Sequence, residues 1–259
     1  MIELLYLLVA LVATTIGAIV GLGGGVIIKP ILDMIGYHDI STIGLLTTIT
    51  VLTMAFVSTI RHLKNKSKLS FKVLYIAAGS IIGGILGNIG FNLMVAETKG
   101  ETVQLTQSVI FIVMISLVLV FLKFKSKIKT HHIESKLITI LAGIILGSIA
   151  SFLGIGGGAF NVVVLMILFS FNAKQAAMNS LMIKLFSQLA KVIMISVSTG
   201  FASYDLTMLR VMIPAGILGG IIGISIQRRI KHRTVDLVFK IVLYFIIIIN
   251  TYNSILILL

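Results

Sequence analysis

The chain contains no cysteine and no tryptophan, and only 11% of its 259 residues are charged. The absence of cysteine excludes disulfide bridges, thiolate chemistry and thiolate metal ligands. The scarcity of charge is equally informative, because soluble domains carry about a quarter of their residues as Asp, Glu, Lys or Arg. Since 58% of the residues are hydrophobic, the composition predicts an integral membrane protein whose helices face lipid and one another.

Acidic residues are especially few, with 8 Asp and Glu against 21 Lys and Arg. All of them except Asp33 fall at or near the ends of apolar segments. The pattern predicts no buried carboxylate relay of the kind that proton-coupled pumps use. No set of nucleophile, base and orienting residue can be assembled, and no pair of the five histidines has metal-ligand spacing. We therefore expect neither an enzyme nor a cofactor, and we interpret His62, in a basic segment, as solvated.

The formal net charge of +13 raises the alternative of nucleic-acid binding. Most of the basic residues, however, gather in three short segments between apolar runs, at 61–72, 123–136 and 228–233. Such clusters are typical of the cytoplasmic loops of membrane proteins. We expect a lipid bilayer and no nucleic acid as partner. The apolar N-terminus has Glu3 and no preceding Lys or Arg, so it lacks the basic region of a signal peptide.

Apolar runs recur along the whole chain at about the length that crosses a bilayer as helix, roughly 20 residues. They lie at 2–20, 26–36, 41–60, 70–96, 105–122, 137–153, 159–171, 175–199, 203–227 and 235–257. The second and seventh are too short to cross, and each follows a glycine cluster. The sequence thus predicts an all-α polytopic fold with nominally eight transmembrane segments.

The two glycine clusters reveal an internal duplication. Residues 21–25 read Gly-Leu-Gly-Gly-Gly and residues 154–158 read Gly-Ile-Gly-Gly-Gly, and the segments that follow them correspond in order. A second pair of motifs, Gly-Gly-Ile-Leu-Gly at 83–87 and Gly-Gly-Ile-Ile-Gly at 219–223, has the spacing that permits close helix packing. We divide the chain into a first repeat at 1–124, a basic cytoplasmic linker at 125–136 and a second repeat at 137–259.

Charge predicts that the repeats are inverted. The acidic segment at 97–101 of the first repeat corresponds to the basic segment at 228–233 of the second. Inversion requires an odd number of crossings in each repeat, which four plain helices cannot supply. We therefore interpret each glycine cluster as the tip of a broken, re-entrant hairpin, followed by three crossings. The rival is a plain eight-helix count, which would place residues 228–233 outside, against the charge rule.

Non-helical backbone inside a bilayer is costly unless protein or a watery cavity covers it. Each cluster opens a short helix, so unpaired N–H groups and the positive end of the helix dipole would point into the membrane interior, as in transporters that hold anions. The alternative is that the glycines only permit tight turns. A phosphate-binding loop is excluded, because no strand precedes either cluster and no Gly-Lys-Ser/Thr follows.

The segment 175–199 adds polar groups at helical spacing, with Lys184 near its middle. An intramembrane lysine indicates function by default, whereas Lys191, nearer an end, could snorkel to the surface. Lys29 is open to the same two interpretations, and Asn88 and Asn92 share one face of the span at 70–96. The residues that we predict to bind an anion are Gly23, Gly24, Gly25, Val26, Thr47, Thr48, Gly156, Gly157, Gly158, Ala159, Asn161, Asn179, Ser180, Lys184 and Gln188.

At the glycine motifs the sequence resembles the sulfite exporter family TauE/SafE, over essentially the whole chain. The resemblance rests on Gly-Leu-Gly-Gly-Gly-x-x-x-x-Pro at 21–30, its second copy at 154–158 and the paired glycine-rich spans. The second copy has Val163 where the first has Pro30. The resemblance implies transport, often export, of sulfite, thiosulfate or small organosulfur anions such as sulfonates across the bacterial cytoplasmic (inner) membrane.

We therefore expect a secondary transporter of small anions that works by alternating access. Two alternatives remain open: a passive anion channel, and a membrane subunit that transports nothing. The sequence leaves the oligomeric state, the coupling ion and the direction of transport undecided.

Overall fold

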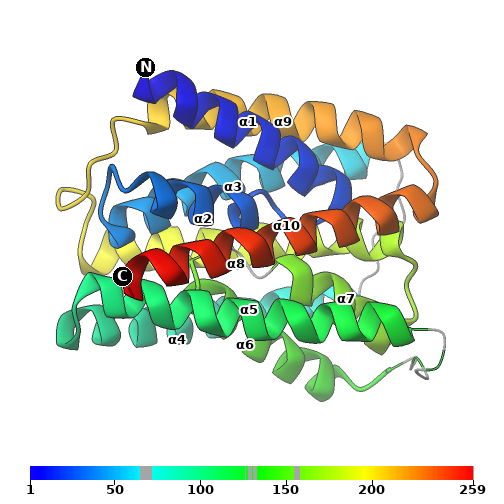
Figure 1. Ribbon diagram of the computed structural model, residues 1–259. Coiled ribbons are helices and arrows are strands. Elements are labelled where there is room, and N and C mark those ends of the chain that lie inside the picture. The colour runs from blue at the N-terminus through cyan, green and yellow to red at the C-terminus, as the bar shows by residue number, and fades with distance from the viewer. Residues whose placement is uncertain (65–71, 126, 128–129, 131–132, 155–157, 259) are drawn as a thin grey trace.

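The computed structural model of the chain (Figure 1) describes residues 1–64, 72–125, 127, 130, 133–154 and 158–258. Within these residues the regular structure consists of ten α-helices and no strand. The helices are α1 (Ile2–Val20), α2 (Gly25–Ile35), α3 (Ile40–Lys64), α4 (Lys72–Glu97), α5 (Gly100–Phe124), α6 (Lys136–Phe152), α7 (Gly158–Phe169), α8 (Ala173–Ser198), α9 (Leu209–Arg229) and α10 (His232–Leu258).

The predicted all-α polytopic fold is confirmed. Seven helices in the described part of the chain are long and apolar enough to cross a membrane, and α2, α6 and α7 are shorter. Most helix ends lie within a few residues of the predicted ones. The largest difference is α9, which begins at Leu209 rather than near 203. The intervening residues form turns, in which the Asp205 carboxylate accepts hydrogen bonds from the backbone and hydroxyl of Thr207.

Glycine ends α1 and starts α2. Gly21, Gly23 and Gly24 have φ angles of 75°, 73° and 43°, in the region that side chains with a Cβ rarely adopt. The chain therefore leaves the helix at residue 21 and re-enters it at residue 25. After α6, Gly154 likewise has a φ of 68°. Both breaks predicted from the glycine clusters are present.

The paired glycine motifs bring helix backbones into direct contact. A Cβ atom at Gly79, Gly83 or Gly87 of α4 would overlap a backbone carbonyl oxygen of α6. A Cβ atom at Gly223 of α9 would overlap the Thr15 carbonyl oxygen of α1, and one at Gly219 would overlap the Thr14 side-chain hydroxyl. The packing role predicted for these motifs is confirmed, since only glycine allows backbones to approach this closely.

Helices of one half pack against helices of the other half. The most extensive contacts join α4 to α6 and α1 to α9, and α9 also lies on α3 as α4 lies on α8. At the centre α3 packs against α8, and α5 packs against α10. The contact of α4 with α6 corresponds to that of α9 with α1, with the two halves exchanged. The contact of α9 with α3 corresponds in the same way to that of α4 with α8.

The basic segments meet at one end of the bundle, as the charge pattern predicts. The Arg228 guanidinium donates to the carbonyl oxygen of Arg61 at 2.5 Å, and the Lys174 ammonium donates to the Arg228 carbonyl at 3.1 Å. Lys72 donates to the Ile133 carbonyl at 3.3 Å. Both chain termini lie at the opposite end, on the left in Figure 1.

The outer surface of the bundle is apolar. Large hydrophobic side chains such as Leu117 on α5, Ile145 on α6 and Ile248 on α10 are 61–66% exposed. A surface of this kind is stable in hydrocarbon and not in water. Together with the seven long apolar helices, it identifies the chain as an integral membrane protein.

Candidate functional site

A polar pocket lies between α2, α3, α4, α5 and α8, toward the end of the bundle that carries the termini. Two lysines and three carboxamides line it, together with the second glycine turn. The lining residues are Lys29, Ile40, Ser41, Gly44, Leu45, Asn88, Phe91, Asn92, Gln107, Gly154, Lys191, Ile195 and Tyr204. We call this pocket the lysine pocket.

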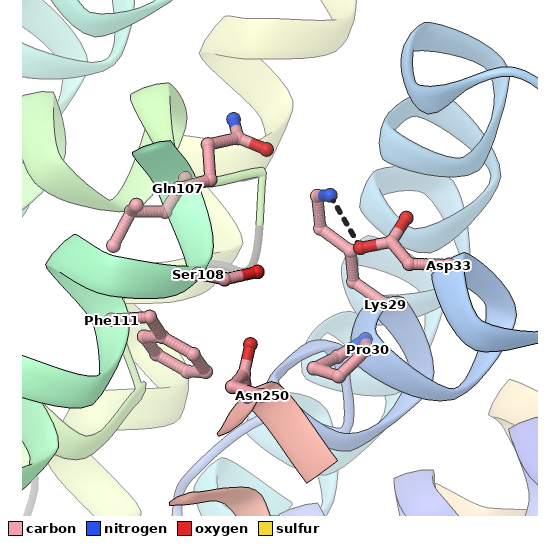
Figure 2. A pocket seen from close by; sticks show the side chains of 8 residues that line it. Lys29, Pro30, Asp33, Gln107, Ser108, Phe111 and Asn250 are labelled. Atoms are coloured by element: carbon pink, nitrogen blue, oxygen red, sulfur yellow. Dashed lines mark hydrogen bonds and ion pairs between the residues drawn. The ribbon is translucent and has the colours of Figure 1, made fainter. Parts of the chain in front are cut away.

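Lys29 of α2 occupies the boundary between the lysine pocket and a second small cavity. Its ammonium group forms an ion pair with Asp33 at 2.8 Å, one helical turn away. Figure 2 shows this pair facing α5, with Ser108 of α5 and Asn250 of α10 pointing into the space between the helices. Both charged side chains are at most 8% exposed.

Asp33, the one acid that the sequence sets apart from the ends of the apolar segments, lies buried among the helices. The physical reason is its pairing with Lys29, because a buried charge is tolerated when an opposite charge and hydrogen bonds compensate it. The snorkelling interpretation of Lys29 is wrong, since the ammonium group turns inward.

Lys191 approaches the same pocket from α8. It is 4% exposed, donates a hydrogen bond to the Ser151 carbonyl oxygen at 3.1 Å, and lies 5.7 Å from the ring centroid of Phe91. Ser151 belongs to the last turn of α6, where unpaired carbonyl oxygens and the negative end of the helix dipole favour a cation. Lys191 therefore does not snorkel, and its charge remains inside the bundle.

The carboxamides of the pocket have unused hydrogen-bonding capacity. The Gln107 amide nitrogen donates to the Phe152 carbonyl oxygen at 2.6 Å, but its side-chain oxygen has no partner among the described residues. The Asn88 amide nitrogen is buried and also lacks an acceptor there. An unsatisfied buried donor costs about 1–3 kcal/mol, so a ligand that supplies an acceptor would be stabilised at Asn88.

The two glycine turns lie against each other in the interior. A Cβ atom at Gly158 would overlap the backbone of Leu22, so the start of α7 contacts the first turn directly. A Cβ atom at Gly21 would overlap the backbone of Ala177 on α8. At the second turn, the Cβ position of Gly154 is 3.4 Å from the Lys29 side chain. Gly154 of the second turn therefore borders the lysine pocket.

Lys184 is fully buried and binds the first glycine turn. Its ammonium group donates to the carbonyl oxygen of Gly21, and its side chain packs over Gly23. The Ser180 hydroxyl donates to the same oxygen at 2.9 Å. Both predicted anion ligands thus satisfy the end of α1, as Lys191 satisfies the end of α6.

The other predicted site residues are buried but do not converge on one cavity. Thr48 donates to the Gly44 carbonyl at 2.7 Å and Asn179 to the Gln175 carbonyl at 2.9 Å. The side-chain oxygens of Thr47 and Asn161 have no partner among the described residues. Gly23, Gly24, Gly25, Val26, Gly158, Ala159 and Gln188 are buried, and Gly156 and Gly157 lie outside the described residues. The predicted role of this set in anion binding stays a prediction.

Sequence reasoning missed Asp33, Gln107 and Tyr204 as residues of the two cavities. For Asp33 a signal existed, because Lys29 and Asp33 stand four residues apart and share a helix face. Gln107 and Tyr204 give no such signal, since they reach the pocket only through packing between distant segments. The solvated interpretation of His62 is also wrong: its ring is 1% exposed and neither nitrogen has a partner in the described part of the chain.

A chain of polar contacts ties together the segments at the rim of the lysine pocket. The Tyr6 hydroxyl lies 2.8 Å from His38 Nδ1, and His38 Nε2 lies 3.4 Å from an Asp205 carboxylate oxygen. The pKa of the Asp205 carboxyl lies below its usual value, first because the Thr207 hydroxyl and backbone N–H donate to it, and then because His38 is near. The contacts join α1, the 36–39 loop and the 200–208 segment.

One protein family and one relative each match most of the chain. The family described as "Sulfite exporter TauE/SafE" matches residues 6–250. A relative from Bacillus subtilis (strain 168), the probable membrane transporter protein YunE, is 26% identical over 262 residues, 91% of this chain and 92% of its own length. No solved structure matches the chain.

Proposed function

Because the chain belongs to the sulfite exporter TauE/SafE family, we propose that it is a secondary transporter that moves sulfite or a related organosulfur anion across the membrane by alternating access. The family relationship makes it a membrane transporter. The substrate class and the mechanism are the parts that we propose here.

The observation that carries the proposal is the lysine pocket. Two ammonium groups, those of Lys29 and Lys191, line one polar pocket at 4% exposure each. With Asp33 ionised, the three charges sum to one positive charge. In the described conformation the pocket has a volume of only about 10 Å³, room for about one water molecule, so it must widen to admit a small oxyanion. The charges favour such an anion, because charge-assisted hydrogen bonds are strongest where water is excluded. The amide nitrogen of Asn88, which lacks an acceptor among the described residues, adds a neutral donor.

Beyond this pocket we propose that the substrate passes the predicted site at the glycine turns. Lys184 lies two helical turns from Lys191 along α8, a rise of about 10 Å. In the described conformation its ammonium group donates to the Gly21 carbonyl oxygen, and the start of α7 at Gly158 packs directly against Leu22. Movement of the hairpins apart would release Lys184 and the amides at the start of the short helices toward the anion.

The pattern of contacts between the halves supports an inverted-repeat mechanism with repeats at 1–124 and 137–259. The first helix of each half, α1 or α6, packs along the fourth helix of the other half, α9 or α4. Structures of this kind can exchange two conformations, related by the pseudo-two-fold axis between the repeats, around a fixed central site. If the basic end is cytoplasmic, the lysine pocket lies nearer the outer end of the bundle.

Transport by the purified protein in proteoliposomes tests the proposal. We expect counterflow of radiolabelled sulfite, thiosulfate or an alkanesulfonate that saturates with concentration and exceeds that of sulfate. Flux that neither saturates nor supports uphill exchange would indicate a channel. Absence of exchange with every one of these anions would refute the proposed function.

Two lysine variants locate the substrate. Lys191→Gln removes a charge-assisted hydrogen bond worth about 1.5–3 kcal/mol, so anion affinity should fall about 10- to 100-fold in scintillation binding. Lys184→Ala should also weaken binding if the glycine turns are part of the path. Lys240→Gln is the matched control, because Lys240 pairs with Asp236 at 3.2 Å outside the pocket. Equal affinity in the Lys191→Gln variant and the unaltered protein would refute this placement.

A further inference from the structure

We propose that Asp33 is the proton-binding residue of this transporter. When the anion binds, the Lys29 ammonium group leaves Asp33 and pairs with the anion, and Asp33 takes up a proton. One proton therefore moves with each monoanion. The proposal rests on the proposed function above and adds its coupling ion. It requires a carboxylate that changes partner when the anion binds, and Asp33 has the position for this.

The position of Lys29 makes the exchange possible. Its side chain lines both cavities, the lysine pocket with Lys191 and the smaller cavity with Asp33, Ser108 and Asn250. Figure 2 shows the ammonium group between Asp33 and the Gln107 side chain. Lys29 has a long, flexible stem with a point charge at its end, so a small rotation transfers the ammonium group from Asp33 toward an anion beside Gly154.

An anion that takes the Lys29 ammonium leaves Asp33 without its counter-charge. A buried carboxylate that loses its partner is costly by several kcal/mol, and the neutral acid is then the favoured form. A proton from the pocket side binds one Asp33 carboxylate oxygen while the hydrogen bond from Lys29 to that carboxylate breaks. No covalent bond other than the new O–H bond forms.

The surroundings of Asp33 offer no competing counter-charge among the described residues. On α2 itself the partner is Lys29. From α1 the phenol of Tyr6 lies within electrostatic reach, and it is neutral and bonded to His38. α5 contributes Gln107 and Ser108 to this cavity, and α10 contributes Asn250, none of which titrates.

The adjoining lysine pocket adds one charged group in the described part of the chain. α3 contributes Ile40 and Ser41 to this pocket, and α8 contributes Lys191. Lys191 is held by the Ser151 carbonyl.

Charge balance gives the proposal a sharp consequence. The empty site holds two ammonium groups and one carboxylate, which is a net charge of +1. The loaded site holds two ammonium groups, one carboxylic acid and one monoanion, which is again a net charge of one. Transport of a monoanion is therefore electroneutral, and the sum of the proton and anion gradients sets its direction. A cell that accumulates the anion would release it together with a proton.

Proteoliposomes loaded with a pH-sensitive dye test this coupling. The first probe is methanesulfonate, which remains a monoanion at any pH of the experiment and cannot carry its own proton, and the second is sulfite. We expect an alkaline interior to drive uphill uptake with one proton entering per methanesulfonate. A potassium and valinomycin potential without a pH gradient should drive none. Uptake driven by the potential alone would overturn the proposal.

Three variants test the proton-binding role of Asp33. Asp33→Asn should lose methanesulfonate uptake driven by the pH gradient, because the amide cannot take up the proton. Asp33→Glu keeps the acid and should retain this uptake. Asp236→Asn removes the carboxylate of a matched pair with Lys240 and should leave the uptake unchanged.

The outcomes are distinguishable. Exchange of neither probe by the unaltered protein refutes the proposed function and this inference with it. Counterflow together with normal pH-driven uptake in Asp33→Asn refutes this inference alone. The proton count on the unaltered protein decides the matter even where Asp33→Asn fails to fold, and a count of zero contradicts the proposal.

Discussion

Three lysines buried in the bundle each have a defined acceptor. Lys184 and Lys191 donate to backbone carbonyl oxygens at the ends of α1 and α6, and Lys29 donates to Asp33. The first two stabilise broken helix ends, whose carbonyls would otherwise be unpaired in a medium without water. The Lys29 pair alone joins two opposite charges, so among these contacts it is the one that protonation can switch.

At the rim of the lysine pocket, Asp205 makes stability depend on pH. Its folded-state pKa lies below the ordinary value of about 3.9. The carboxylate therefore contributes stability at neutral pH, and this contribution disappears as the pH falls through the lowered pKa. We expect Asp205→Asn to lower the melting temperature in detergent at pH 7, with the difference from the unaltered protein shrinking as the pH falls below about 4.

The companion variant for this prediction is Thr207→Val. It removes the hydroxyl that donates to Asp205 at 2.7 Å, so the folded-state pKa moves back toward the ordinary value. The acid-induced loss should then be smaller and should be complete at a higher pH than in the unaltered protein. A melting-temperature difference between Asp205→Asn and the unaltered protein that stays constant from pH 7 to pH 3 would show that Asp205 makes no titrating contribution.

At the scale of helices, the contact between α4 and α6 depends on glycine. A Cβ atom at Gly83 would overlap the Ile144 carbonyl oxygen, a backbone atom that cannot move away alone. Gly83→Ala should therefore lower the free energy of unfolding by about 1–3 kcal/mol, the usual cost of overpacking. Thermal or denaturant unfolding in detergent measures the change.

Gly90→Ala is the control on the same helix. Its new Cβ atom would lie 3.8 Å from the Phe152 ring, an ordinary contact, and alanine favours helix by up to about 1 kcal/mol over glycine. We expect this variant to be neutral or more stable. Equal losses in Gly83→Ala and Gly90→Ala would mean that backbone approach does not determine the α4–α6 contact.

The helices could be predicted from the sequence, and the cavity could not. The glycine clusters and apolar runs predict α1, α2, α6 and α7 closely, because helix breaks and bilayer lengths are local properties of the chain. The lysine pocket joins Gly154, Asn88 and Tyr204, which no local pattern connects. Lys184 shows the same limit: its central position predicts a functional charge, but its partner Gly21 depends on how α8 meets the first turn.

At the scale of the whole molecule, the account depends on two hairpins that enter from opposite ends and meet inside. Contacts of Tyr6 with His38 and of His38 with Asp205 place both ends of the first hairpin near the 200–208 segment. The Ile133 backbone N–H donates to the Leu168 carbonyl at 3.0 Å, which places both ends of the second hairpin together. The contact of Gly158 with Leu22 joins their tips.

Cysteine labelling in intact cells tests this arrangement most directly, because the chain has no cysteine of its own. We expect Glu3→Cys and Tyr37→Cys, which flank the first hairpin, to react with a membrane-impermeant maleimide added outside. Lys136→Cys and Asn172→Cys, which flank the second, should react only after the membrane is opened. Labelling of the two members of either pair from opposite sides would show that the hairpin crosses the bilayer and would contradict the account.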